Sequence, residues 1–264
     1  MNSISLITDF GTRDWFVGTM KGAILNVNRR ATITDLTHEI ARGDILAGAF
    51  GLLAGCRFFP KGTVHVAVVD PGVGSRRQAI AAQTEDYFFV GPDNGVLSLA
   101  LLRGQIKSIH ALENETYFLK PVSRTFHGRD IFAPVAAHLS RGVSIQKLGP
   151  RLQGFVKLAW PRPRSLEGEV QGEIVHVDRF GNLMTNIGAE SLGVFGDKPC
   201  EVFAKRKRRC PIALFYSAVP AGRPLAVLGS TGYLEIAING DSAAAKFRLR
   251  VGDRISVRPR VKSR

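Results

Sequence analysis

The chain has 264 residues, of which 45% are hydrophobic, and its mean hydropathy is +0.03. These values are typical of a globular protein with one large domain or two smaller ones. No apolar segment is long enough to span a bilayer and no signal-peptide pattern opens the chain, so we expect a cytoplasmic protein that does not bind membranes. Cys56, Cys200 and Cys210 lack the spacing of a disulfide framework or a zinc site, and we expect them to be buried or incidental thiols.

The chain is strongly basic, with 36 Lys and Arg against 22 Asp and Glu and a formal net charge of +14. Such a charge attracts nucleic acid or an anionic membrane through its long-range field alone. Much of the excess lies in two runs, at residues 205–209 and 258–264. Neither run accompanies an RNA-binding strand or helix-turn-helix pattern, so we favour a solvated hairpin tip and a fraying tail over a nucleic-acid footprint.

The first half of the chain alternates predicted strands and helices. Residues 4–9 predict a strand that ends in Asp9, and apolar side chains at helical spacing over residues 16–27 predict a helix that Asp14 caps. Residues 31–36 predict a second strand, and Asp44 is placed to cap a second helix. With a further strand at 64–69, the order β-α-β-α-β is typical of helices packed on a largely parallel sheet.

Residues 64–77 carry the strongest candidate for a site. Their apolar strand ends at Asp70, and the carboxyl edge of a parallel sheet is where ligands bind in α/β folds. The Pro-Gly-Val-Gly that follows permits a sharp turn, and Arg77 offers a planar fork that can hold a carboxylate. From spacing alone, a tight structural turn with a surface arginine explains the pattern about equally well.

Two shorter predicted strands, at residues 78–84 and 86–91, precede a turn at 92–95 for which we expect a structural role. Further along, Gly128 or Asp130 can start a helix. His127 therefore lies in a loop before a helix N-terminus, where the positive end of the dipole disfavours its protonation. A single loop histidine is more often solvated or structural than catalytic.

Residues 149–168 contain three prolines and no helical periodicity, and we interpret residues 151–167 as a linker between domains 1–150 and 168–264. The second domain contains short alternating segments that predict a small antiparallel sheet or barrel. Two of its turns offer stacking, amide and carboxylate groups that suit an adenine base and an amino-acid head group, although each can be an ordinary hairpin loop. Their candidate residues are Asp178, Phe180, Asn182, Ser230 and Tyr233.

Together these motifs resemble the S-adenosyl-L-methionine (SAM) hydroxide adenosyltransferase family, which is related to the bacterial fluorinase and chlorinase. The resemblance covers essentially the whole chain, with the motifs in the order of the family. They are ITDFGT (7–12), VVDPGVG (68–74) with Arg77, GPDNG (91–95), TFHGRDIFAP (125–134), DRFGNLMTNI (178–187) and GSTGYLEIA (229–237).

The resemblance implies an α/β fold with an N-terminal Rossmann-like domain, and hydrolysis of SAM to adenosine and L-methionine without a cofactor or metal. The water-activating set of the family corresponds to Asp70, Arg77 and His127. Arg76 is adjacent, but Arg77 is the arginine that lies seven residues after Asp70, as in the motif of the family. The halogenases carry tyrosine at the position of Asp70 and lack the arginine and histidine, so the resemblance is to the hydrolases.

The resemblance also implies the substrate contacts. Asp9 would hold the ribose hydroxyls, Phe180 and Asn182 the adenine, and Asp178 and Ser230 the two ends of the methionine. Thr231 stands where fluorinase has an arginine, which leaves the carboxylate contact open. The family is a homotrimer whose sites lie between the N-terminal domain of one subunit and the C-terminal domain of the next.

Two other functions remain open from the sequence. One is a module that binds adenosine or SAM without turnover, and the other is a basic RNA-associated protein built on the same fold. Assaying for adenosine separates the first from a hydrolase, and salt-sensitive RNA binding tests the second.

Overall fold

The structure is a computed structural model that describes residues 3–260. It contains two compact units, residues 1–159 and residues 160–264, which we call the N-terminal unit and the C-terminal unit. The division falls inside segment 151–167, which we interpreted as a linker. Residues 261–264, the end of the basic C-terminal run, lie outside the described part. Among residues 3–260 we find no helix with the length and hydrophobicity needed to cross a membrane.

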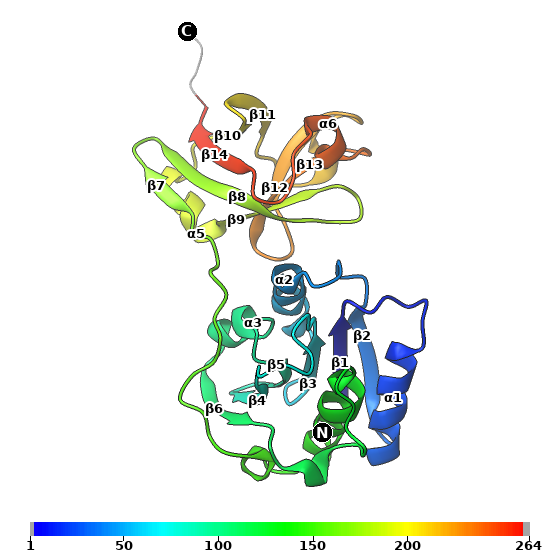
Figure 1. The fold of residues 1–264 in the computed structure, drawn as a ribbon. Helices are drawn as coiled ribbons and strands as arrows, with labels where there is room; N and C mark the ends of the chain where they lie inside the picture. Colours follow the sequence, from blue (N-terminus) through cyan, green and yellow to red (C-terminus); the bar gives the residue numbers. More distant parts are fainter. Residues whose placement is uncertain (1–2, 261–264) are drawn as a thin grey trace. The chain divides into compact units, whose positions relative to one another are not determined.

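A six-stranded mixed sheet forms the middle of the N-terminal unit, in the order β2-β1-β3-β5-β4-β6 (Figure 1). The first four strands of this order are parallel neighbours, and β4 runs antiparallel to both β5 and β6. This confirms the prediction of a largely parallel, Rossmann-like sheet. The strands are β1 (Ser3–Thr8), β2 (Thr32–Thr37), β3 (Val64–Val68), β4 (Ala79–Thr84), β5 (Phe88–Pro92) and β6 (Ile106–Ala111).

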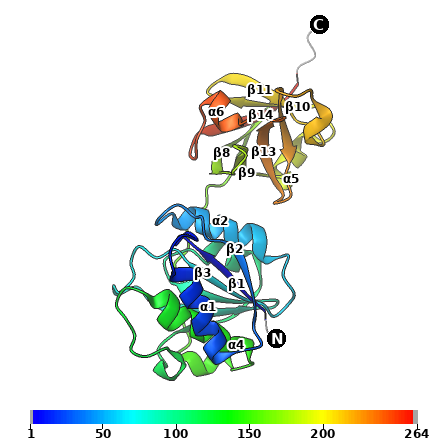
Figure 2. The ribbon, with the colours of Figure 1, turned by 90° about the vertical axis from the view of Figure 1, so that its right-hand side faces the viewer.

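Helices cover both faces of this sheet (Figures 1 and 2). Side chains of β3 alternate between two apolar clusters, with Val66 in one and Ala67 in the other, so the strand is buried on both faces as its apolar run predicts. Helices α1 (Phe16–Val27) and α4 (Ala133–Ser140) pack in the first cluster, and α2 (Ile45–Cys56) and α3 (Ser98–Arg103) in the second. Short helical turns are η1 (Glu115–Tyr117), η2 (Gly128–Phe132) and η3 (Ile145–Leu148).

The two predicted helix caps have different outcomes. Asp44 caps α2, because its side chain accepts a hydrogen bond of 2.9 Å from the Ala47 amide. The prediction that Asp14 caps α1 is wrong. Trp15 occupies the N-cap position with helical dihedral angles and without a side-chain bond, so no extended residue directs an oxygen at the free amides.

The C-terminal unit is all-β apart from short helical turns. Its antiparallel sheet has the order β11-β10-β14-β8-β9-β13-β12, and a bridge between Ile212 and Ala226 brings its two ends together as a nearly closed barrel. The fold prediction for this half is therefore confirmed. The strands are β7 (Arg164–Leu166), which pairs with β8 (Glu169–Val177), then β9 (Leu183–Gly188), β10 (Cys200–Ala204), β11 (Lys207–Pro211), β12 (Pro224–Leu228), β13 (Tyr233–Ile238) and β14 (Arg254–Pro259). The helical turns are α5 (Ala189–Leu192), η4 (Gly193–Phe195), η5 (Tyr216–Ala218) and α6 (Ala243–Phe247).

The cysteines are free thiols, as the sequence predicts. Cys56 and Cys210 are buried and Cys200 is partly buried. Burial raises the pKa of Cys56 and Cys200 above the ordinary value of a thiol, so both thiols are protonated at neutral pH.

Candidate active site

Two carboxylates leave the same edge of the N-terminal sheet. Thr8 at the end of β1 is in register with Val68 at the end of β3, so Asp9 and Asp70 follow neighbouring strands at the carboxyl edge. Asp9 Oδ2 accepts a 2.8 Å hydrogen bond from the Gly43 amide in the loop before α2. This edge is where ligands bind in α/β sheets.

Two nitrogens of Arg77 donate hydrogen bonds to the Asp70 carboxylate. Its Nε lies 3.1 Å from Oδ1 and 3.0 Å from Oδ2 of Asp70, and its Nη2 lies 2.5 Å from Oδ2. The Arg77 side chain is only 11% exposed and that of Asp70 only 4%. Arg77 is therefore not the surface arginine that the spacing left open, and the charge-assisted pair holds the Asp70 carboxylate in one orientation.

His127 lies on the other side of the same guanidinium. Arg77 Nη2 is 2.8 Å from His127 Nδ1. Since a guanidinium can only donate, Nδ1 accepts, and the neutral ring carries its proton on Nε2. Burial and then the charge of Arg77 lower the pKa of His127, against the opposing effect of Asp70. The ring is therefore neutral at pH 7, as predicted, but desolvation and Arg77 are the main causes rather than the helix end.

A glycine brings the two loops of this cluster together. Gly74 has φ +76°, and a Cβ there would lie 2.3 Å from the backbone oxygen of Arg124, in the segment before His127. Only a residue without a side chain fits this approach. The loop after β3 can therefore pack directly onto the segment that presents the histidine.

Buried Asp130 fixes the other side of the histidine loop. Its side chain is 0% exposed and its Oδ2 accepts a 2.8 Å hydrogen bond from the Ser123 amide, while Arg129 Nε lies 2.6 Å from Oδ1. The Arg77 guanidinium also lies 5.5 Å from the centre of the Phe132 ring in η2. The sequence interpretation missed both contacts. Asp130 was considered only as a helix start, although a carboxylate three residues after a candidate histidine is a usable signal.

The predicted turn at residues 92–95 has the structural role expected of it. Asn94 Nδ2 donates to the backbone oxygen of Val69, 2.8 Å away, and so secures the chain just before Asp70. Its Oδ1 accepts from the Val96 amide at 3.1 Å.

In the C-terminal unit, Asp178 organises its own loop. Its Oδ1 accepts from the amides of Phe180 and Asn182 at 2.9 and 2.8 Å, and its Oδ2 from Asn182 Nδ2 at 3.0 Å. A Cβ on Gly181 would lie 2.0 Å from the Ser242 hydroxyl, so this glycine allows the loop to pack against residues 241–242. Asn182 is thereby held at the mouth of a pocket.

That pocket has a volume of about 510 Å³. Phe180, Asn182 and Tyr216 line it together with residues 238–242, and the Phe180 ring is 77% exposed. The structure thus brings two of the predicted adenine contacts to one cavity. Tyr216 was missed, because its segment has no strand or turn pattern that links it to the loop at Asp178.

Ser230 and Tyr233 lie in the β12–β13 hairpin and do not line this pocket. Glu235 connects the hairpin to it, because its Oε1 accepts a 2.5 Å hydrogen bond from Tyr216 Oη. A Cβ on Gly229 would lie 2.9 Å from Glu235 Oε2, which shows how closely the hairpin approaches this carboxylate. Burial raises the pKa of Glu235, and the nearby charge of Asp178 adds to the effect.

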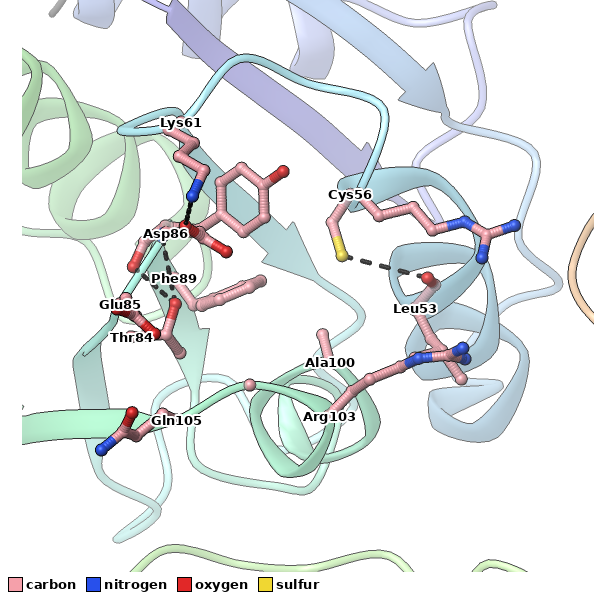
Figure 3. Close-up of a pocket in the computed structure, with 13 residues that line it drawn as sticks. Leu53, Cys56, Lys61, Thr84, Glu85, Asp86, Phe89, Ala100, Arg103 and Gln105 are labelled. Carbon is pink, nitrogen blue, oxygen red and sulfur yellow. Dashed lines mark hydrogen bonds and ion pairs between the residues drawn. The ribbon is translucent and has the colours of Figure 1, made fainter.

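A second cavity of about 510 Å³ lies at the opposite, amino edge of the N-terminal sheet (Figure 3). The charged side chains that line this cavity do not form a buried cluster. Lys61 Nζ lies 2.7 Å from Asp86 Oδ1, but the two side chains are 81% and 41% exposed. Among residues 3–260, no group of three or more His, Cys, Asp and Glu is arranged to hold a metal ion.

The chain matches the models of two protein-family domains. The SAM hydroxide adenosyltransferase N-terminal domain matches residues 4–149, and the C-terminal domain of the same family matches residues 172–256. The chain belongs to the SAM hydroxide adenosyltransferase family. Both matches fall on the two units described above, so family membership extends to the β-barrel as well as to the mixed sheet.

Among its relatives, a Thermus thermophilus protein named (R)-S-adenosyl-L-methionine hydrolase is 36% identical over 96% of this chain and 98% of its own length. A Methanocaldococcus jannaschii protein of the same name is 42% identical over 71% of this chain and 67% of its own length. A fluorinase from an Actinoplanes species is 26% identical over 96% of both chains. The crystal structure of an uncharacterized conserved protein from Thermotoga maritima superposes with a TM-score of 0.92 at 37% identity, covering 96% of this chain and 99% of that one.

Proposed function

We propose that this protein hydrolyses SAM to adenosine and L-methionine. Relatives that match almost the full length of the chain carry the name of that activity. The observation that carries the proposal is the cluster in which one guanidinium holds both Asp70 and His127 at the carboxyl edge of the sheet. In the halogenases, the resemblance leads us to expect tyrosine in place of Asp70 and neither of its partners.

The chemistry requires help for the nucleophile only. The oxygen of a water molecule forms a bond to the ribose C5′, the C5′–S bond breaks, and its electron pair returns to sulfur, which leaves as a neutral thioether. Water has a pKa of about 15.7, so a metal-free site must align it and accept its proton as the new bond forms. No general acid is needed for this leaving group.

The cluster suits that task. Asp70 aligns the water and accepts its proton, and Arg77 keeps Asp70 in place. His127, neutral and bound to the other side of the Arg77 guanidinium, provides the second contact to the water. The proton then passes from Asp70 to solvent when adenosine leaves.

The substrate contacts follow the resemblance. Asp9 would accept from the ribose hydroxyls, and the exposed ring of Phe180 and the amide of Asn182 would bind the adenine. Asp178 already accepts three hydrogen bonds, and a carboxylate offers about four such positions, which leaves one for the methionine ammonium. Ser230 and Tyr233 would bind the rest of the methionine from the β12–β13 hairpin.

A complete site would require two subunits. We propose a homotrimer in which the N-terminal unit of one subunit and the C-terminal unit of the next share each site. Light scattering tests the trimer. Mixing inactive Asp70→Ala and Asp178→Ala subunits, dissociated and reassembled at equal amounts, should restore about a quarter of the sites in the shared arrangement. Mixtures that remain inactive while assembling as trimers would mean that each chain builds its own site.

The decisive assay is product analysis. Purified protein incubated with SAM should release adenosine and methionine in equal amounts, and activity should survive EDTA, since we propose no cofactor or metal. Excess chloride should yield no chloroadenosine. Tight SAM binding without any adenosine would instead establish a binding module, and loss of activity in EDTA with rescue by a divalent cation would overturn the metal-free mechanism. A cytoplasmic location stays a prediction.

A further inference from the structure

The surplus of positive charge is denser in the C-terminal unit. Residues 160–264 carry 18 Lys and Arg against 10 Asp and Glu, whereas the longer N-terminal unit carries 18 against 12. The proposed hydrolysis uses none of this excess. Its distribution on the barrel therefore needs a separate explanation.

Many of these cations line one hollow surface. A cavity of about 610 Å³ is lined by Lys205, Arg206, Arg254 and Arg258, without a carboxylate among its lining residues. A smaller cavity of about 240 Å³ shares Gln171 and Arg254 with it, and its lining has three arginines and one carboxylate, Glu173. We call the combined surface the basic groove, formed by Arg162, Arg164, Lys205, Arg206, Arg254 and Arg258.

The groove is assembled from three distant segments of the chain. Arg162 and Arg164 come from the beginning of the unit, Lys205 and Arg206 from the β10–β11 turn, and the last two from β14. The sequence interpretation of the run at 205–209 as an exposed hairpin tip is correct for the turn at Lys205 and Arg206. The sequence alone does not show that cations from other segments lie beside this turn, because those segments are far apart along the chain.

Two of the cations are anchored by neighbouring groups. Arg258 Nε bonds Glu169 Oε2 at 2.6 Å, and its guanidinium lies 4.9 Å from the centre of the Phe203 ring. Lys205 Nζ donates to the Arg248 backbone oxygen at 2.7 Å and lies 3.6 Å from Asp253 Oδ2.

Near the other four cations lies one carboxylate, Glu173, which lines the smaller cavity and is in register with Arg254 across β8 and β14. Within residues 3–260, the structure gives Arg162, Arg164, Arg206 and Arg254 no ion pair, and all four are exposed. Lys205 and Arg206 also adopt positive φ angles of 49° and 60°, which hairpin turns normally assign to Asn or Gly. Basic side chains occupy the tip even though the turn geometry favours other residues.

We propose that the basic groove binds the phosphodiester backbone of single-stranded nucleic acid. Arginines that make no ion pair within the described residues and are spaced along a hollow can follow a chain of phosphates. An anionic membrane fits less well, because its flat surface reaches only the rim of a hollow, and Phe203 is packed under Arg258 rather than projecting outward.

Salt dependence gives the first test. Binding of fluorescein-labelled 12-nucleotide oligouridylate and oligothymidylate is measured by fluorescence anisotropy between 50 and 200 mM KCl. With four to six phosphates contacted, the log–log slope should be about −3 to −4, a loss of affinity of about 100-fold across this range. Comparing the two oligonucleotides distinguishes RNA from DNA as the source of the backbone.

Charge-matched variants give the second test. Arg206→Ser with Arg254→Ser should flatten the slope by about 1.4 and weaken binding at least tenfold at 50 mM KCl. Arg29→Ser with Arg30→Ser removes the same charge from an exposed turn of the N-terminal unit and should change binding less than threefold. Melting temperatures verify that both doubles are folded.

Three results would overturn the proposal. The first is no saturable binding at 50 mM KCl, and the second is an equal loss in both double variants, which would mean diffuse attraction by net charge. The third is binding to vesicles containing phosphatidylserine, lost in the groove variant, without binding to either oligonucleotide. None of these readouts depends on SAM hydrolysis.

Discussion

The two ends of the N-terminal sheet contain similar residue types in different arrangements. At the carboxyl edge, Asp70 and His127 share one buried guanidinium. At the amino edge, His65 is 0% exposed, its Nδ1 lies 2.6 Å from Ser5 Oγ, and its ring packs against Phe59, Tyr87 and Phe89. The charged residues there form a solvent-exposed pair at the rim of a cavity as large as the one in the C-terminal unit.

The difference shows what distinguishes a candidate active site. It is the direct contact between several charged and titratable side chains, rather than the size of a cavity or the burial of one residue. Burial alone lowers the pKa of His65 to about 4, which makes it a permanently neutral core residue. His127 also has a lowered pKa, but a cation and a carboxylate within its own cluster contribute to the value. The predictions below test this contrast, beginning with the largest expected effect.

Removing either partner of Arg77 should remove most of the activity. Asp70→Ala and His127→Ala should each lower kcat by about 10²–10⁴-fold, the usual contribution of a positioned acid–base group. Lys61→Ala at the amino edge should leave kcat within twofold. Adenosine release by chromatography measures all three. If Asp70→Ala stays active, the carboxyl edge is not the active site. If the variants lose activity only because they unfold, Asp70 and His127 are structural residues like His65.

Arg77→Lys tests whether shape matters as well as charge. A lysine keeps the positive charge but cannot hold Asp70 with two nitrogens and reach His127 at the same time, so we expect kcat to fall by about 100-fold. Because Arg77 Nη2 donates to His127 Nδ1, a lysine that no longer reaches the ring should also raise the apparent pKa of His127 and move the acid limb of the pH–rate profile upward. An unchanged profile would contradict a positioning role.

His65 should control acid stability rather than activity. Its pKa is near 6.5 when unfolded and about 4 when folded, so the unfolded chain binds more protons between these values. The free energy of unfolding should therefore fall by about 3 kcal/mol as the pH drops from 6.5 to 4. His65→Asn, which cannot titrate, should lack this component in urea titrations and keep its kcat at pH 7.5. An identical pH slope in variant and wild type would be the contrary result.

Gly74→Ala should give the smallest effect of the four. Its new Cβ would collide with the Arg124 backbone oxygen and displace the histidine loop, so kcat should fall about tenfold with about 1 kcal/mol of stability lost to the positive φ angle. Gly142→Ala is a matched control, because Gly142 has φ +90° and nothing within 4 Å of its Cβ position. Equal kcat in the two variants would mean that the close approach does not position His127.

The sequence by itself determined the order of the elements and the chemistry available at their ends. The mainly apolar run of β3 indicates burial on both faces, which favours a parallel sheet and places Asp70 at its carboxyl edge. Turn chemistry located the loop around Asp178 in the same way, whereas only the resemblance to the family singles out His127. Local patterns sufficed for these features because periodicity and turn chemistry act over a few residues.

Only the tertiary structure decided which distant groups meet. The bond between Arg77 and His127 spans 50 positions, and the contact between Tyr216 and Glu235 joins segments without a shared pattern. The basic groove likewise exists only after the barrel brings residues 162–164, 205–206 and 254–258 together. Such long-range contacts depend on how strands pair and how sheets pack, and no short-range propensity in the chain encodes them.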